Sequence, residues 1–216
     1  NMDLFIKKIN KCKLTHEKKD KSPILNYILN TYKFVNGLEF GVYKGGTLKL
    51  MSKYIQNVTG FDSFEGFPID WDIGSKIVDK NIFKTNEMIS NNNITIVKGW
   101  FNETLDNFLI NNINIKYDFI HIDCDIYEST IYVFETLHNY NKLHDVYIVF
   151  DELLNYENYQ DGELKAFLEI IEKYKYNYDV IMCPKNIHFN KNNLKDKTFK
   201  QLRSLVYGQE CCIYIK

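Results

Sequence analysis

The sequence has little of what marks secreted, membrane-spanning or nucleic-acid-binding proteins. None of its five cysteines forms a C-x-x-C pair, and their number is odd, so we expect reduced thiols in a cytoplasmic protein. No apolar run approaches the roughly 18 residues of a membrane span, and the N-terminus lacks the apolar core of a signal peptide. The net charge is −1, and no basic stripe with interleaved aromatics occurs, which argues against a nucleic-acid partner.

Length and patterning favour one α/β domain. The chain has 216 residues, enough for a single sizeable core. Short apolar runs alternate with stretches of helical spacing, which predicts a doubly wound, mainly parallel, seven-stranded sheet covered by helices on both faces. Helical patches before residue 34 include a helix start at Ser22-Pro23. We expect strands near 34–40, 57–62, 94–98, 117–123, 146–150, 179–182 and 211–215. We expect helices near 45–56, 80–91 and 129–139, a further helix capped by Asn102, and another that begins after Gly162.

A glycine-rich turn follows the first predicted strand. Its pattern is Glu39-x-Gly41-x-x-x-Gly45-Gly46, which is neither G-x-G-x-x-G nor a P-loop. A strand, a glycine turn and a helix together favour a nucleotide-type cofactor, because glycines admit a ligand close to the backbone and a helix N-terminus offers free N–H groups. Glu39 at the strand end suits a positive centre or an amino group. A purely structural βα turn is the alternative.

Acidic residues gather where the predicted strands end, which is the edge at which open α/β sheets bind ligands. Asp62 lies about 20 residues beyond the glycine turn, the spacing of a carboxylate that binds a ribose hydroxyl; a turn cap is its alternative. Asp123, Asp151 and Glu152 are hard oxygen ligands suited to Mg²⁺ or Mn²⁺. Asp125 points to a general base. The structural alternative is that these acids cap helices and bind loop amides.

His121 and Cys124 flank Asp123 in the strongest predicted strand and its end. His121 shares a strand face with Asp123, because side chains alternate along a strand. His121 could act as a base or a metal ligand, or it could be a core histidine with its hydrogen bonds satisfied. Its position in the middle of the strand favours the core histidine. We interpret Cys124 as a small buried residue, since no histidine lies near it in a hydrolase pattern.

Five motifs in order resemble the macrocin O-methyltransferase family, class I S-adenosylmethionine-dependent enzymes that methylate hydroxyls of sugars or other natural-product rings. They span about residues 39–167. The motifs are Glu39-Phe40-Gly41-Val42-Tyr43-Lys44-Gly45-Gly46, Gly60-Phe61-Asp62-Ser63-Phe64-Glu65-Gly66, Lys98-Gly99-Trp100-Phe101 with Glu103-Thr104-Leu105, Ile120-His121-Ile122-Asp123-Cys124-Asp125 with Tyr127 and Ser129-Thr130, and Phe150-Asp151-Glu152 with Gly162-Glu163.

The resemblance implies a Rossmann-like sheet with an antiparallel last strand, S-adenosylmethionine as cofactor and a small-molecule acceptor, with no nucleic-acid or membrane partner. It implies that residues 1–33 form a helical cap, lid or oligomer contact, and 34–216 the methyltransferase domain. Implied metal positions are Asp123, Asp151 and Glu152, with Asp125 as base and His121 as a second catalytic candidate. Implied cofactor residues are Glu39, Gly41, Tyr43, Gly45, Asp62, Ser63, Phe64, Gly99, Trp100 and Asp123.

Two other functions stay open from the residues. A metal-dependent glycosyltransferase would use Asp123-Cys124-Asp125 as a D-x-D motif for a sugar nucleotide, but the glycine turn and the placement of Asp62 argue against it. A non-catalytic cofactor-binding module would keep Glu39 and Asp62 and have no use for the acids between 123 and 152.

Overall fold

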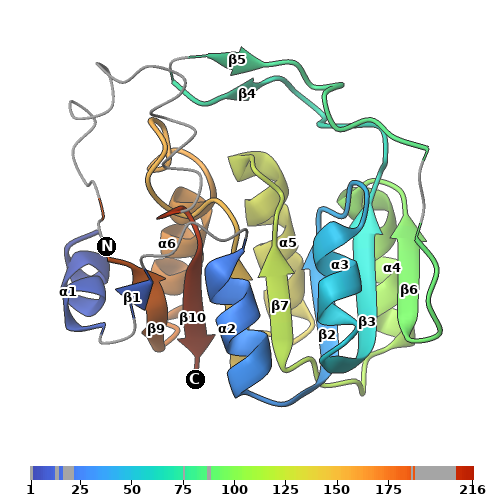
Figure 1. Cartoon of the computed structure of the whole chain (residues 1–216), viewed down its shortest axis with the longest axis horizontal. Coiled ribbons are helices and arrows are strands. Elements are labelled where there is room, and N and C mark those ends of the chain that lie inside the picture. The colour runs from blue at the N-terminus through green and yellow to red at the C-terminus, as the bar shows by residue number, and fades with distance from the viewer. Residues whose placement is uncertain are drawn as a thin grey trace.

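A single eight-stranded sheet forms the centre of the computed structural model, which describes residues 2–12, 15–16, 22–74, 76–86, 89–185, 187 and 208–216. The strand order is β1-β9-β10-β8-β7-β2-β3-β6 (Figure 1). The strands are β1 (Thr15–His16), β2 (Phe34–Phe40), β3 (Ile55–Asp62), β6 (Ile94–Lys98), β7 (Phe119–Ile122), β8 (Val146–Phe150), β9 (Tyr178–Pro184) and β10 (Cys211–Ile215).

The predicted seven-stranded sheet is confirmed, and the two-residue β1 adds an eighth strand at one edge. β10 runs antiparallel to both β8 and β9, while the other pairs in this sheet are parallel. β2 lies between β3 and β7. The chain therefore proceeds from β2 to one side of the sheet and later returns to the other, which places a topological switch point, a usual ligand site, between β2 and β7.

Helices cover both faces of the sheet (Figure 1). The central strand β7 is buried along its whole length, which is why it reads as a continuous apolar run. α2 and α3 pack into the core on one face, and α1, α4, α5 and α6 pack into the core on the other. The helices are α1 (Met2–Lys11), α2 (Pro23–Thr31), α3 (Gly46–Met51), α4 (Phe101–Asn111), α5 (Tyr127–Asn139) and α6 (Glu163–Tyr174). None of the helices in the described ranges is long and apolar enough to cross a membrane.

An arm, described over residues 63–74 and 76–86, lies above the carboxyl ends of the strands (Figure 1). It carries a separate two-stranded sheet of β4 (Trp71–Asp72) and β5 (Ile77–Val78). The predicted helix over 80–91 is wrong, because residues 80–83 form a turn and the other described residues of that range have no regular secondary structure. Asp79 explains part of this: its carboxylate accepts a hydrogen bond from the Asn81 backbone N–H at 2.7 Å, a local bond that competes with helix formation.

Three smaller expectations also need correction. The helix predicted to reach residue 56 ends at Met51, and β3 begins at Ile55. Asn102 lies inside α4, and Trp100 precedes the helix. Ser22 precedes α2 as expected, but its side chain makes no capping hydrogen bond.

Gly41 directly follows β2 and lies against Asp123, which directly follows β7. Its φ is +94°, and a Cβ built on it would lie 1.8 Å from the Asp123 carbonyl oxygen. Gly46 is the first residue of α3, and a Cβ built on it would have no heavy atom within 4 Å. The two glycines therefore differ sharply in what a methyl group would meet.

We expect Gly41→Ala to destabilise the fold by roughly 3 kcal/mol, since both the clash and the positive φ oppose a side chain. Thermal unfolding should show a loss of about 6–12 °C in Tm. Gly46→Ala is the control, and its Tm should stay level or rise slightly, because alanine favours a helix by up to about 1 kcal/mol over glycine. Equal effects of the two substitutions would contradict the close approach of β2 and β7.

Glu210, just before β10, supplies the cap that Ser22 does not. Its Oε2 accepts a hydrogen bond from the Ile24 backbone N–H at 2.7 Å, in the first turn of α2. Burial, followed by the charge of Asp151, raises the pKa of Glu210 from its ordinary value to about 8. The cap therefore joins the start of the last strand of the sheet to the first turn of α2.

This raised pKa predicts that stability falls as the pH rises. The folded state holds the Glu210 proton up to about pH 8 and the unfolded state loses it near its ordinary value, so its stabilising effect is full below that value and is lost as pH rises through 8. The slope for one proton is at most about 1.4 kcal/mol per pH unit. Denaturant unfolding in EDTA between pH 6 and 9 should show a shallower slope for Glu210→Gln than for the wild type. Parallel slopes would contradict the prediction.

Candidate functional site

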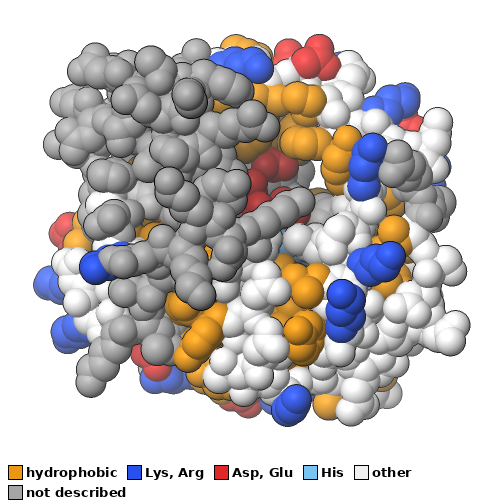
Figure 2. Space-filling model, viewed as in Figure 1, with side chains coloured by type: hydrophobic (Ala, Val, Ile, Leu, Met, Phe, Trp, Pro, Cys, Tyr) orange, Lys and Arg blue, Asp and Glu red, His pale blue; other side chains and the backbone are white. Residues whose placement is uncertain are grey.

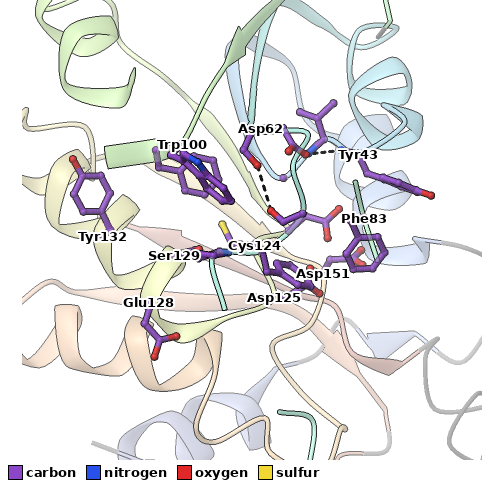
Figure 3. A pocket seen from close by; sticks show the side chains of 18 of the residues that line it. Tyr43, Asp62, Phe83, Trp100, Cys124, Asp125, Glu128, Ser129, Tyr132 and Asp151 are labelled. Atoms are coloured by element: carbon purple, nitrogen blue, oxygen red, sulfur yellow. Dashed lines mark hydrogen bonds between the residues drawn. The ribbon is translucent and has the colours of Figure 1, made fainter. Parts of the chain in front are cut away.

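A cavity of about 810 Å³ opens above the carboxyl ends of β2, β3, β7 and β8. Figure 3 shows side chains from these strand ends and from α5 turned toward a common space. Of the residues singled out in the sequence, those that line the cavity are Gly41, Tyr43, Asp62, Ser63, Gly99, Trp100, Asp123, Cys124, Asp125, Asp151 and Glu152. Cys124 is also buried, as predicted. Those that do not line it are Glu39, Gly45, Phe64 and His121.

Asp62 ties the glycine turn to the end of β3. Its Oδ2 accepts hydrogen bonds from the backbone N–H groups of Val42 at 2.8 Å and Tyr43 at 2.7 Å. Its Oδ1 accepts one from the Phe64 N–H at 2.6 Å. Tyr43 and Phe64 both have positive φ, 49° and 59°, a conformation that non-glycine residues hold only when their surroundings enforce it. One carboxylate thus holds two strained loops beside the cavity.

Gly45 and Phe64 shape the cavity from behind its wall. A Cβ on Gly45, whose φ is +71°, would lie 2.5 Å from Ile89. Phe64 is buried and packs into the core on the face of α2 and α3. Neither residue lines the cavity, and their contact with a cofactor stays a prediction.

Glu39 and His121 form a fully buried pair beneath the cavity. His121 Nδ1 lies 3.0 Å from Glu39 Oε1. Burial raises the pKa of Glu39. Burial lowers the pKa of His121, but the carboxylates of Glu39, Asp151 and Glu210 outweigh this and raise it. His121 Nε2 is buried without a hydrogen-bond partner among the described residues, so the alternative of a core histidine with its hydrogen bonds satisfied is not matched. Ligand-capable atoms of Glu39, His121 and Asp123 also lie within 4.8 Å of one another, and the catalytic role of His121 stays a prediction.

Three carboxylates converge at the cavity floor. Ligand-capable oxygens of Asp123, Asp125 and Glu152 all lie within 4.8 Å of one another. Asp151 lines the same cavity but does not belong to this group. The grouping therefore differs from the set Asp123, Asp151 and Glu152 chosen from the sequence, because it takes in Asp125, the residue predicted as base. Figure 2 shows acidic side chains inside a hollow beside a band of apolar side chains.

Crowding and burial oppose ionisation of these acids. Burial and then the charge of Asp151 raise the pKa of Asp125 to about 8, although a hydrogen bond with Glu152 works in the opposite direction. The same two causes, burial first and Asp151 second, raise the pKa of Asp123 and of Glu152 well above the usual range. Among the described residues, Glu152 Oε2 is buried without a hydrogen-bond partner. Protons or a cation would relieve this repulsion.

Negative charge dominates the described lining of the cavity. Lys44 is the basic residue among the described lining side chains. The acidic ones are Asp62, Glu103, Asp123, Asp125, Glu128, Asp151 and Glu152. A ligand with a positive centre, or a metal ion, suits such a lining better than a polyanion does.

Several lining residues escaped the sequence analysis. Phe67, Pro68 and Phe83 come from the arm, and Phe83 packs against Tyr43 with ring centroids 5.3 Å apart. Glu128 and Tyr132 come from α5. The concentration of aromatic residues in the loop after Asp62 was the available signal for the arm. No comparable signal marked the α5 residues, because helical spacing alone does not say which exposed face meets a cavity.

Comparisons with known proteins agree with this architecture. The macrocin-O-methyltransferase (TylF) family model matches residues 33–167. The crystal structure of CalS11, a calicheamicin methyltransferase, is similar with a TM-score of 0.53 and 22% sequence identity, covering 73% of this chain and 71% of that one. The O-methyltransferase from Bacillus cereus in complex with SAH has a TM-score of 0.54 and 14% identity, covering 99% and 88%. At these identities the two structures show the shared fold. No curated protein matches the chain.

The family match identifies more than the fold, because it also includes the residues of the candidate site. It covers well over half of the chain and includes the glycine turn, Asp62 and the acids at the ends of β7 and β8. The chain therefore belongs to the macrocin O-methyltransferase family and is an S-adenosylmethionine-dependent methyltransferase.

Proposed function

We propose that the protein methylates a hydroxyl group of a sugar, or of a sugar-containing or other natural-product acceptor, with assistance from Mg²⁺. The convergence of Asp123, Asp125 and Glu152 at the floor of the cavity is the observation that carries this proposal. A glycosyltransferase that binds a sugar nucleotide has no support once the family is known. The acids also argue against a binding module without catalysis, which would have no use for them.

The glycine turn and the ends of β3 and β6 are the proposed place for the methyl donor. S-adenosylmethionine supplies an electrophilic methyl group on a positively charged sulfur. Asp62 faces the cavity with both oxygens already oriented by backbone N–H groups, so it can accept further hydrogen bonds from ribose hydroxyls. Gly99 and Trp100 line the wall next to it and offer a flat surface to adenine. The acidic lining favours the positive charge of the donor.

The donor set at the floor fits Mg²⁺. Carboxylate oxygens are the ligands that Mg²⁺ prefers, and an unpartnered buried oxygen on Glu152 points to a missing ligand. Asp123 and Glu152 would hold the ion, with Asp151 beside them. When bound, Mg²⁺ acts as a Lewis acid that lowers the pKa of an acceptor hydroxyl.

Asp125 is the proposed proton acceptor. It lines the cavity in the same turn as Asp123, and burial and the charge of Asp151 raise its pKa above the ordinary value, which makes its carboxylate a stronger base. In the transfer, the acceptor oxygen forms a bond to the methyl carbon, the bond from carbon to sulfur breaks, and the hydroxyl proton passes to Asp125. The remaining contribution of the protein is to hold the reacting atoms in line.

The part of the cavity wall that comes from the arm suits a ring-shaped acceptor. Phe67 and Phe83 pack edge to face with centroids 5.3 Å apart, and Pro68 lines the cavity beside them. Apolar surface opposite carboxylates fits a sugar, whose ring face is apolar and whose edge carries hydroxyls. Ser22, from the segment 1–33, also lines the cavity, which supports the proposal that this segment caps the site; an oligomer contact is its alternative role.

Cofactor binding is the first test. Asp62→Asn should weaken S-adenosylhomocysteine about 5- to 150-fold by calorimetry, which corresponds to roughly 1–3 kcal/mol for unpaired polar partners. Asp118→Asn is a matched control, because Asp118 accepts hydrogen bonds from the backbone N–H groups of Val35 and Asn36 at the opposite edge of the sheet. That variant should bind the ligand as the wild type does. A wild type that binds no S-adenosylhomocysteine would contradict the cofactor site.

Metal dependence is the second test. Mg²⁺ should raise the Tm of the wild type and EDTA should reverse the rise, by mass action on the folded state. Glu152→Gln should abolish the shift. Asp125→Asn should keep it and slow methyl transfer from labelled S-adenosylmethionine to a panel of vicinal-diol sugars, because only proton removal is lost. If Asp125→Asn also loses the shift, Asp125 is a ligand instead of the base, and full activity in EDTA would refute the role of the metal.

A further inference from the structure

The turn that carries Asp123 and Asp125 is strained. Asp125 has a φ of 64°, in the left-handed region, which a non-glycine residue holds only when its surroundings enforce it. The first residue of the turn is fixed by the sheet, since the Asp123 N–H donates to the Phe40 carbonyl at 2.9 Å. The next two N–H groups have no strand to pair with, because β7 ends at Ile122.

Glu163, the first residue of α6, provides the missing acceptor. Its Oε1 accepts hydrogen bonds from the backbone N–H groups of both Cys124 and Asp125, each at 3.2 Å. Glu163 is fully buried, and α6 follows β8 in the chain, so this contact joins two successive units of the fold. One oxygen atom thus satisfies both backbone donors of the strained turn.

Gly162 allows this approach. A Cβ built on it would lie 2.1 Å from the Tyr156 hydroxyl and 3.5 Å from the Asp125 carbonyl oxygen. A larger residue would push α6 away from the turn or displace Tyr156. The dipeptide Gly162-Glu163 therefore works as a unit: the glycine lets the helix start close to the turn, and the glutamate binds it.

Glu163 does not line the cavity, so it does not touch a ligand there. We propose that Glu163 is a positioning residue, which holds the Asp123–Asp125 turn in the conformation that directs both aspartates into the cavity. This inference rests on the proposed function in one respect, namely that these aspartates bind the metal and take up the proton.

The contact with the turn depends on the length of the side chain at position 163 and not on its charge. Both backbone N–H groups bind a single oxygen, and Glu163 Oε2 has no hydrogen-bond partner among the described residues. The amide oxygen of glutamine can replace Oε1 at the same distance without a charge. Aspartate keeps the charge but is one methylene shorter, so it cannot reach the turn from the same helix position.

Amide exchange in the ¹⁵N-labelled full chain tests the contact without any acceptor. In Glu163→Leu and Glu163→Asp, exchange at Cys124 and Asp125 should accelerate about tenfold or more, while Asp123 and Asp151, whose N–H groups bond within the sheet, stay protected. Glu163→Gln should match the wild type. Glu135→Leu is the control for general destabilisation, because Glu135 accepts hydrogen bonds from Lys173 and Tyr174 between α5 and α6; it should leave Cys124 and Asp125 unchanged.

Mn²⁺ binding by electron paramagnetic resonance and S-adenosylhomocysteine binding by calorimetry then separate positioning from folding. Glu163→Leu and Glu163→Asp should weaken Mn²⁺ binding about tenfold or more and leave S-adenosylhomocysteine binding within about threefold of the wild type. Glu163→Gln should bind Mn²⁺ as the wild type does. The proposal would be overturned by unchanged amide exchange in Glu163→Asp, or by Glu163→Gln behaving like Glu163→Asp. If the wild type binds no Mn²⁺ but the exchange pattern holds, the metal part of the proposed function fails and the positioning role of Glu163 stands.

Discussion

Repulsion among carboxylates in a poorly hydrated space is the constraint on which this site depends. Asp123 and Asp125 follow β7, and Asp151 and Glu152 follow β8, so parallel strands deliver all of them to one edge. Each charge opposes ionisation of its neighbours, and burial adds to the effect. Such a group lowers stability unless protons or a cation compensate. The fold therefore sustains a local cost that only ligand binding or protonation removes.

Other acids in the same region have the opposite task. Asp62, Glu163 and Glu210 each accept hydrogen bonds from backbone N–H groups, at the glycine turn, at the Asp123–Asp125 turn and at the start of α2. These bonds satisfy donors that no strand or helix pairs, which is the usual requirement for a buried loop. Glu163 and Glu210 thus hold the backbone without lining the cavity, whereas Asp62 both holds the backbone and lines the cavity.

Much of this could be predicted from the sequence. The apolar runs that became β2, β6, β8 and β10 have the expected bounds or lie within a residue of them, because a buried parallel strand has a simple signature. Acids at strand ends pointed to the correct edge. The predicted helix over 80–91 is a turn at residues 80–83, where the Asn81 N–H bonds to the Asp79 carboxylate, and the spacing of apolar residues does not encode such a local bond. The pairing of Glu39 with His121 also depends on strands far apart in sequence.

The choice of partners on the cavity floor depends on side-chain length, which a pattern of acids does not encode. Glu152 has one methylene more than an aspartate, and it reaches Asp125, with which it shares a hydrogen bond. Two carboxyl groups can form such a bond only if one holds a proton. A cation that binds Glu152 would therefore displace this proton and free Asp125 to accept another. Under the proposed function, in which Glu152 holds the metal and Asp125 is the base, metal binding and proton removal would be coupled through Glu152.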